Sequence, residues 1–392
     1  MPDLAFTQGE FDRRLAAVRA DMAARGIDTI AISVPENIYY LSGYSAHSFY
    51  SHQVLLVSVA EHDPLLIVRA MDVRCAVHTS WLPAESLMGY DDSYVDNPDR
   101  HPWALFARTL RERGFATGRI GLELEGYWLS PKAAAEFTAA VPESEIVDAT
   151  GLVNWVRTVK SGPELVLMRE AGMIADKAMR AAYEAIRPGV RECDAMSHIV
   201  AAQIAGTDTI SGHFPSEPVF LAAGERADAP HLYWRPSPFA ANGSVNVELG
   251  GVRAHYNVGL SRTITLGAPP AGIERLMDAN REALATGLDY AVAGALAEDV
   301  EAAFRERLAR YGYDKPSRVG YSIGVGMAPT WIDRTVSLRP GDKTMLREGM
   351  TLHLMAGLWR EEASCVLSET FIVRDGPPEI LTAMPRDLHR AS

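Results

Sequence analysis

A single carboxylate stands out in residues 244–263, SVNVELGGVRAHYNVGLSRT, which we interpret as a strand, a tight bend and a second strand. Glu248 follows two valines at alternating positions of the first strand. Eleven residues later, where a partner carboxylate would complete an acidic pair, the chain has Gly259. Burying a carboxylate costs free energy unless the group is paired or used in chemistry. Glu248 is therefore either a structural acid paired with an arginine or a functional group, and the pattern favours neither.

Glu369 has a similar setting in SCVLSETFIV, another apolar run typical of a strand. Two carboxylates that project into one cleft can divide the roles of general acid and general base between them. We therefore predict a catalytic role for Glu369 beside Glu248. The alternative is a solvent-facing residue on an edge strand.

Two histidines lie near apolar segments. His231, in ADAPHLYW, follows a proline and belongs to a loop or to the start of a strand. Because loops carry functional residues more often than the elements they connect, we predict that His231 is catalytic. His353, in GMTLHLMAGLW, lies within a strand, where a structural histidine is the commoner case. A place in the wall of the substrate site is the functional alternative for His353.

An arginine and a tyrosine complete the candidate site. Arg334, in APTWIDRTVSL, has the planar guanidinium that binds a carboxylate through two hydrogen bonds. Its alternative is a surface ion pair with Asp333 or Glu361. Tyr321, in RVGYSIGVGM, has glycines on both sides, which indicates close approach of the backbone to a ligand. The alternative for Tyr321 is ordinary packing in a glycine-rich turn.

The first half of the chain must supply an α/β scaffold. Thr7 and Glu10 fit a helix capping box, apolar residues follow at helical spacing, and Gly26 marks the helix end. Short β-rich runs follow at residues 29–34, 52–59, 64–68 and 120–124, with a helix at residues 131–140. Alternation of strands and helices over this length predicts an α/β domain with a central sheet.

The second half changes character at residues 158–164. The sequence SGPE at residues 161–164 opens a long helix, with Pro163 near its first position. We expect helices near residues 163–186, 191–206, 271–290 and 297–312. We expect strands near residues 217–222, 244–250, 253–260, 350–358 and 364–373. These predict an α+β domain with helices packed against an antiparallel sheet, and two domains of residues 1–157 and 158–392.

Composition excludes several functional classes. The 392-residue chain has a net charge of −12 and no run of lysines and arginines, so we expect no nucleic-acid partner. No apolar run is long enough for a transmembrane helix, and the N-terminus lacks the pattern of a signal peptide. Three distant cysteines provide neither a disulfide framework nor a metal motif, which suits the reducing cytoplasm. The motifs GxSxG, HExxH and the P-loop are absent.

With these residues in view, the chain resembles the creatinase/aminopeptidase "pita-bread" family over essentially its whole length. The resemblance rests on VRTVKSGPELVLMREAG at the domain boundary and on the strand pair that ends in LSRT. In metal-dependent members, five residues of the C-terminal domain bind two metal ions. The corresponding positions here are Glu248, Gly259, Tyr321, Met355 and Glu369. Glycine, tyrosine and methionine are poor ligands for such ions, so the resemblance implies no catalytic metal and no cofactor.

Within the family, the chain looks like the metal-free branch of creatinase, and more closely like the ectoine hydrolases. Segments such as GYDDSYVDNPDRHPW, HYNVGLSRTITLG and GYSIGVGMAPTWIDRTVSLRPGD carry this likeness, whereas residues 325–327 and 361–365 depart from it. The expected reaction is hydrolytic opening of the cyclic amidine of ectoine or hydroxyectoine to an N-acetyl-diaminobutyrate. Glu248 would pair with the amidinium or attack its carbon, and His231 would transfer protons.

The resemblance also implies the remaining contacts. Glu369 would hold a ring nitrogen or orient water, and Arg334 would bind the substrate carboxylate. The pocket wall would include Tyr321, His353 and Tyr256. In this family the partner's N-terminal domain usually closes the site of a homodimer, which implicates Phe49 and His52 in HSFYSHQ.

Three other functions stay open from the sequence. The first is creatinase or another guanidino-acid amidinohydrolase, with which the scaffold and His231 are equally compatible. The second is an Xaa-Pro peptidase, which the lost ligand positions argue against. The third is a non-catalytic module that binds a small molecule without product formation.

Overall fold

The N-terminal domain is built around one mixed sheet. The computed structural model describes residues 2–60, 63–116 and 118–391, and it divides into two compact units, Met1–Arg157 and Thr158–Ser392. The strands of the first unit are β1 (Thr29–Ile32), β2 (Val54–Ser58), β3 (Leu65–Arg69), β4 (Leu87–Tyr90), β5 (Arg119–Leu122) and β6 (Glu145–Asp148). They form a six-stranded sheet in the order β4-β3-β2-β1-β5-β6. The β1–β2 and β2–β3 pairs are antiparallel and the other pairs are parallel.

Helices alternate with these strands along the chain, as predicted for an α/β domain. They are α1 (Gln8–Ala24), α2 (Pro35–Ser42), α3 (Val73–Thr79), α4 (Pro102–Glu112), α5 (Pro131–Ala140) and α6 (Leu152–Val156). The N-terminal capping box is wrong, because the Thr7 side chain makes no cap hydrogen bond and Glu10 instead pairs with Arg13 and Arg14. Gly26 does follow the helix end, with a φ of 65° that favours glycine.

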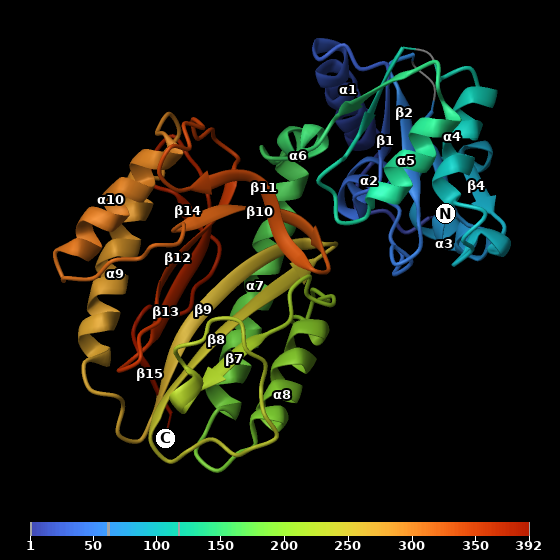
Figure 1. The fold of residues 1–392 in the computed structure, drawn as a ribbon. Helices are drawn as coiled ribbons and strands as arrows, with labels where there is room; N and C mark the ends of the chain where they lie inside the picture. The colour runs from blue at the N-terminus through green and yellow to red at the C-terminus, as the bar shows by residue number, and fades with distance from the viewer. Residues whose placement is uncertain (1, 61–62, 117, 392) are drawn as a thin grey trace. The chain divides into compact units, whose positions relative to one another are not determined.

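The C-terminal domain places four helices against a nine-stranded sheet (Figure 1). The helices are α7 (Gly162–Ala185), α8 (Glu192–Ala205), α9 (Ile273–Tyr290) and α10 (Ala297–Ala309). The strands are β7 (Phe220–Ala223), β8 (Gly243–Arg253), β9 (Tyr256–Leu266), β10 (Gly320–Met327), β11 (Thr330–Leu338), β12 (Thr351–Leu358), β13 (Cys365–Ile372), β14 (Glu379–Ile380) and β15 (His389–Ala391). Helix α7 lies beside β8 and β9, with α8 next to α7, and α9 lies beside β12 and β13, with α10 next to α9 and β11.

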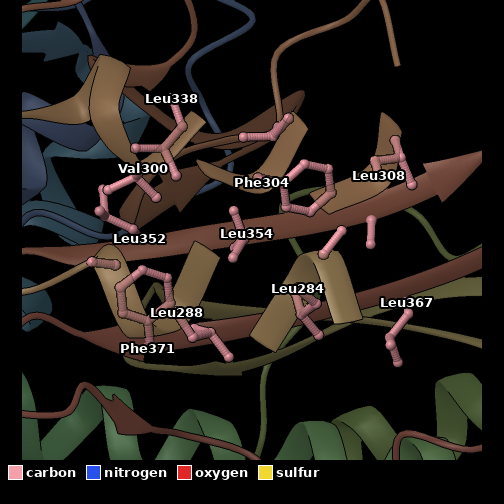
Figure 2. Close-up of a cluster of buried hydrophobic side chains, with 14 of the residues drawn as sticks. Leu284, Leu288, Val300, Phe304, Leu308, Leu338, Leu352, Leu354, Leu367 and Phe371 are labelled. Atoms are coloured by element: carbon pink, nitrogen blue, oxygen red, sulfur yellow. The ribbon is translucent and has the colours of Figure 1, made fainter. Parts of the chain in front are cut away.

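The helices cover one face of this sheet and leave the other for polar side chains. Figure 2 shows the apolar cluster between α9, α10 and the sheet, with Leu354 of β12 near Phe304 of α10. On the other half of the sheet, a β-carbon at Gly251 would lie 2.0 Å from the Ala171 carbonyl oxygen of α7. Successive strand residues point to opposite faces, so the neighbours of Leu354 and Gly251 in their strands point away from the helices.

The long helix α7 begins as the sequence predicts. The Ser161 hydroxyl accepts a hydrogen bond from the Glu164 backbone N–H, and the Ser161 backbone N–H donates to the Glu164 carboxylate, which completes a capping box. A buried ion pair between Lys160 and Asp333 of β11, 2.7 Å apart, joins the start of the domain to the sheet. None of the helices in the described ranges is both long and apolar enough to span a membrane.

Candidate active site

The central feature of the candidate site is Glu248 on the helix-free face of β8. In the β8–β9 ladder Glu248 pairs with Ser261, and Gly250 pairs with Gly259. Glu248 and Gly250 are two residues apart and therefore share a face. We call this the site face, defined by Glu248, Gly250 and Gly259, together with Tyr321 of β10 and His353 of β12, which are paired with each other.

Glu248 is poorly stabilised as an anion. Its side chain is half-buried, and among the described residues its carboxylate has neither a hydrogen-bond donor nor an ion pair. Burial, followed by the negative charge of Glu217, raises the pKa of Glu248 from 4.5 to about 8, against the opposing charge of Lys315. Such a group gains from any cationic ligand that reaches it.

Aromatic rings occupy the space above the two paired glycines. A β-carbon built on Gly250 would lie 2.7 Å from Cζ3 of Trp331, and one built on Gly259 would lie 2.9 Å from Cε1 of His353. Trp331 is fully buried, and its indole N–H donates to the Tyr321 hydroxyl at 3.1 Å. Only glycine fits at these two positions, because real β-carbons do not approach other atoms so closely.

His353 presents a hydrogen-bond acceptor. The Thr370 hydroxyl donates to the Gly259 carbonyl oxygen at 2.8 Å, so its oxygen accepts from Nδ1 of His353 at 2.9 Å. This assigns the proton to Nδ1 and leaves the buried Nε2 as an acceptor without a partner within the described residues. Burial and the charge of Arg262 lower the pKa of His353 to about 3, so the ring is neutral near neutral pH.

The sequence did not identify Glu217 as a site residue. It lies in the loop before β7 and accepts hydrogen bonds from the Thr330 hydroxyl at 2.7 Å and from the Trp331 backbone N–H at 3.4 Å. Burial raises its pKa, although these hydrogen bonds oppose the shift. Its charge acts on both Glu248 and Tyr321, so it belongs to the same electrostatic cluster. A loop acid before a short strand has no pattern by which sequence alone could have identified it.

His231 lies at the edge of this cluster. Its ring centroid is 5.2 Å from that of Phe220, and Phe220 pairs with Glu248 across the β7–β8 ladder. His231 is exposed, and its charge acts on Glu217. An exposed histidine beside half-buried carboxylates is suited to exchanging protons with water.

Two cations that the sequence analysis did not select also belong here. Lys315 is 3% exposed, and its charge acts on Glu248. Arg318 places its guanidinium carbon 4.6 Å from the centre of the Tyr321 ring, and its charge acts on Glu217. Burial raises the pKa of Tyr321 well above 10, so the hydroxyl keeps its proton and acts as a donor.

The prediction that Glu369 shares a cleft with Glu248 is wrong. Glu369 pairs with Leu354 in the β12–β13 ladder and therefore lies on the helix-covered face, opposite to His353. Its Oε1 is 2.8 Å from Arg262 and 3.0 Å from Arg386, and its Oε2 accepts from the Thr382 hydroxyl. With both oxygens occupied, this carboxylate fastens the C-terminal segment to the sheet.

The predicted role of Arg334 is not supported by its position in the C-terminal domain. Trp331 and Asp333 of β11 are fully buried, whereas Arg334 is exposed and has a φ of 58°. The positive φ marks an irregularity in β11 that takes the side chain away from the buried face of this strand. Lys315 and Arg318 are the cations whose charges act on the two carboxylates of the site.

Tyr256 is a structural residue, contrary to its predicted place in the substrate site. It is fully buried, and its hydroxyl donates to Oε1 of Glu164 at 2.7 Å. Glu164 is the acid of the α7 capping box. Tyr256 therefore connects the start of β9 to the first turn of α7.

Phe49 and His52 lie in the N-terminal domain. The Phe49 ring is 5.1 Å from that of Trp128, and Nδ1 of His52 accepts from the Trp103 indole N–H at 3.2 Å. Burial and the neighbouring His101 lower the pKa of His52 to about 4, so it is neutral. His52 also lines a pocket of about 330 Å³ with Tyr94 and His101 among others. Their contribution to a partner's site stays a prediction.

The site face does not fit a pair of metal ions. Within residues 2–60, 63–116 and 118–391, no three side chains of histidine, cysteine, aspartate or glutamate are grouped so that they could hold a metal. Gly259 offers no ligand, Trp331 and His353 occupy the space beside it, and Glu369 faces away. Bridging carboxylates, which two-metal sites need, are therefore missing at this place.

Comparison with known proteins gives matches over both domains. Residues 166–375 match metallopeptidase family M24, and residues 14–159 match the creatinase/prolidase N-terminal domain. The chain is 38% identical over 392 residues to the ectoine hydrolase of Halomonas elongata, covering 98% of each chain. It is also 38% identical to an uncharacterized hydrolase/peptidase of Sinorhizobium fredii over 98% of each. Among solved structures, the recombinant prolidase of Thermococcus sibiricus has the same fold, with a TM-score of 0.83, 19% identity and coverage of 97% and 99%.

Proposed function

Because the chain belongs to metallopeptidase family M24 and carries the creatinase/prolidase N-terminal domain, we propose that it is a hydrolase of the cyclic amidine ectoine. The relative from Halomonas elongata supports the choice of substrate, since the likeness extends over 98% of both chains. The observation in the structure that supports the proposal is the half-buried carboxylate of Glu248, which has neither a hydrogen-bond donor nor an ion-pair partner among the described residues. A protonated amidine is a compact cation that would supply both the charge and the hydrogen-bond donors this carboxylate lacks.

The reaction adds one water molecule across a C–N bond of the ring. Water oxygen becomes the acetyl oxygen, the ring C–N bond breaks, and the leaving nitrogen takes a proton, which gives an N-acetyl-diaminobutyrate. Glu248 releases its proton to water when the amidinium binds beside it, because the positive charge favours the ionised carboxylate. The carboxylate then stabilises the amidinium as an ion pair or attacks its carbon to form a covalent adduct. His231 removes a proton from water and returns one to the leaving nitrogen.

Two groups on the site face would orient the ring. The unpartnered Nε2 of His353 accepts a hydrogen bond from an amidine N–H, because its ring carries its proton on Nδ1. The Tyr321 hydroxyl already accepts from Trp331, so its own proton is available for the tetrahedral centre that develops during attack. We further propose that this chemistry needs no metal ion, because aromatic rings take the place of the ligands.

We propose that the protein acts as a homodimer in the cytoplasm. The free cysteines Cys75, Cys193 and Cys365 suit a reducing compartment. The dimer would bring Phe49 and His52 of one subunit near the site of the other, as the family resemblance implies.

The test is to treat the protein with a chelator, add ectoine and follow the ring protons by NMR. We expect the ring signals to be replaced by those of acetyl-diaminobutyrate. Glu248→Gln should abolish this change while Glu184→Gln, at an exposed position of α7, leaves it intact. Activity that appears only after metal is added would refute metal independence. Ring signals that stay unchanged both with and without added metal would refute ectoine as the substrate. Urea formation from creatine would then favour the amidinohydrolase alternative.

A further inference from the structure

Lys315 is a buried cation that the proposed mechanism does not use. It lies in the loop between α10 and β10, with 3% of its surface exposed. Its ammonium group donates to the Ser317 hydroxyl at 2.8 Å and lies 5.0 Å from the centre of the Trp359 ring. An ammonium group has three donors, and these two contacts leave part of that capacity unused.

No carboxylate within 4 Å neutralises Lys315 in the described parts of the chain. Arg305, whose charge acts unfavourably on it, is itself tied to Glu301 and Asp314. Burial, assisted by Arg305, lowers the pKa of Lys315 to about 8, and only the charge of Glu248 opposes this shift. A buried cation without a carboxylate partner costs free energy, and an anionic ligand that binds it would offset that cost.

An ionised Glu248 and Lys315 are complementary in charge, and neither has an ion-pair partner among the described residues. The Trp359 ring, against which the Lys315 ammonium lies, packs over Gly357 of β12, where a β-carbon would lie 2.4 Å from Cη2 of Trp359. Gly357 is four residues from His353 in a regular strand and therefore lies on the site face, so Lys315 approaches the same face as Glu248. The two groups form no ion pair with each other, although the charge of each acts on the pKa of the other. A direct pair would cancel both charges and leave the site neutral to ligands. Held apart, the two groups can receive a molecule that carries a positive and a negative group on one small frame.

We propose that Lys315 binds the carboxylate of a zwitterionic substrate whose amidinium faces Glu248, and that Lys315 thereby sets the specificity of the site for acids. This inference rests on the proposed function for the role of Glu248. Trp359 contributes by placing its ring against the ammonium, which favours the cation on its side of the site. The role replaces the one predicted for Arg334.

The test measures kcat/KM of the wild type and of Lys315→Met on each of two compounds. The compounds are ectoine and the same methylated cyclic amidine without its carboxylate. For ectoine, Lys315→Met should lower kcat/KM by about 10- to 100-fold, as expected for loss of a charge-assisted hydrogen bond. For the compound without a carboxylate, the same substitution should change kcat/KM by less than about two-fold, because no partner for Lys315 remains. Equal losses on both compounds, or no loss on either, would overturn the proposal.

Controls separate this role from folding and from the proposed function. Lys343→Met makes the same change at an exposed position and should leave both compounds unaffected. Lys315→Met should melt no lower than the wild type, because it removes a buried charge without a carboxylate partner. If it does not fold, Lys315→Gln removes the same charge and keeps a group able to bond Ser317. If the wild type opens neither ring, the proposed function has failed. The role of Lys315 is then tested by calorimetry, which measures the dissociation constants of both compounds for the wild type and for Lys315→Met. Weaker binding of ectoine alone by the variant would support the role, and an equal change for both compounds would overturn it.

Discussion

The raised pKa of Glu248 predicts that this carboxylate destabilises the fold as pH rises. The folded protein keeps the proton up to about pH 8, whereas the unfolded chain releases it near 4.5. Between these values the unfolded state binds fewer protons, so the free energy of unfolding falls by about 1.4 kcal/mol per pH unit at most. Glu248→Gln imitates the protonated form and removes this dependence.

The magnitude follows from that window. Between about pH 6 and about pH 9 the wild type should lose at most roughly 3 kcal/mol through this group, most of it below pH 8. Because part of the side chain remains open to water, we expect about half of this loss. Glu248→Gln should therefore exceed the wild type in stability by roughly 1–2 kcal/mol more at about pH 9 than at about pH 6.

Urea unfolding at the two pH values, followed by circular dichroism, measures this difference. Glu184→Gln is the control, since it removes an exposed charge from the same domain and should keep the pH dependence of the wild type. If the stability gap between Glu248→Gln and the wild type is the same at both pH values, the surrounding protein does not raise the pKa of this carboxylate. The mechanism would then lose its main support, because an ordinary solvated glutamate has no need of a cationic ligand.

Two further substitutions test the packing on either face of the sheet. Gly259→Ala should lower the free energy of unfolding by about 1–3 kcal/mol, because its β-carbon would lie 2.9 Å from the His353 ring. The control is Gly376→Ala, which should be nearly neutral because its β-carbon would meet nothing within 4 Å. Equal melting temperatures for the two variants would contradict the crowding at Gly259. Glu369→Gln should cost roughly 3 kcal/mol in urea unfolding by breaking buried ion pairs, with KM unchanged in the folded enzyme. A raised KM with intact stability would instead return Glu369 to the substrate site.

Local sequence signals predicted the elements that depend on local chemistry. The capping box at Ser161 forms because the Glu164 carboxylate is available to its backbone N–H. The similar box at Thr7 does not form because the carboxylate of Glu10 binds two arginines one turn further along the helix. The two patterns look alike in sequence, and the difference lies in competition for the same oxygen atoms.

The glycine-rich segment around Tyr321, which is not among the predicted strands, is strand β10. Its glycines do not break the strand; a β-carbon at Gly320 would lie 2.6 Å from the His353 carbonyl oxygen, and one at Gly326 would lie 2.7 Å from Cα of Trp331. Glycine is required there by neighbours that are distant in the chain. The glycines in the sequence indicate that other atoms come close to this backbone. They do not show that those atoms belong to His353 and Trp331 rather than to a ligand.

The error on Glu369 has a different origin, because it concerns which face of a strand a residue occupies. Glu248 and Glu369 each lie in an apolar strand and look equivalent in sequence. A shift of one residue in register exchanges the two faces of a strand, and the register is set by pairing with distant strands. The sequence could therefore identify Glu248 and His353 as candidates without excluding Glu369.

The paired glycines beneath Trp331 also bear on how such a protein could change over evolutionary time. An aspartate introduced at Gly259 would collide with Trp331 and His353 before it could bind any ion, so the first step toward a metal site would lower stability without adding a function. Trp331 and His353 would first have to be replaced by smaller residues, and each replacement would leave a cavity. The Trp331 and His353 rings therefore keep this position closed to a metal-binding side chain unless they are replaced first.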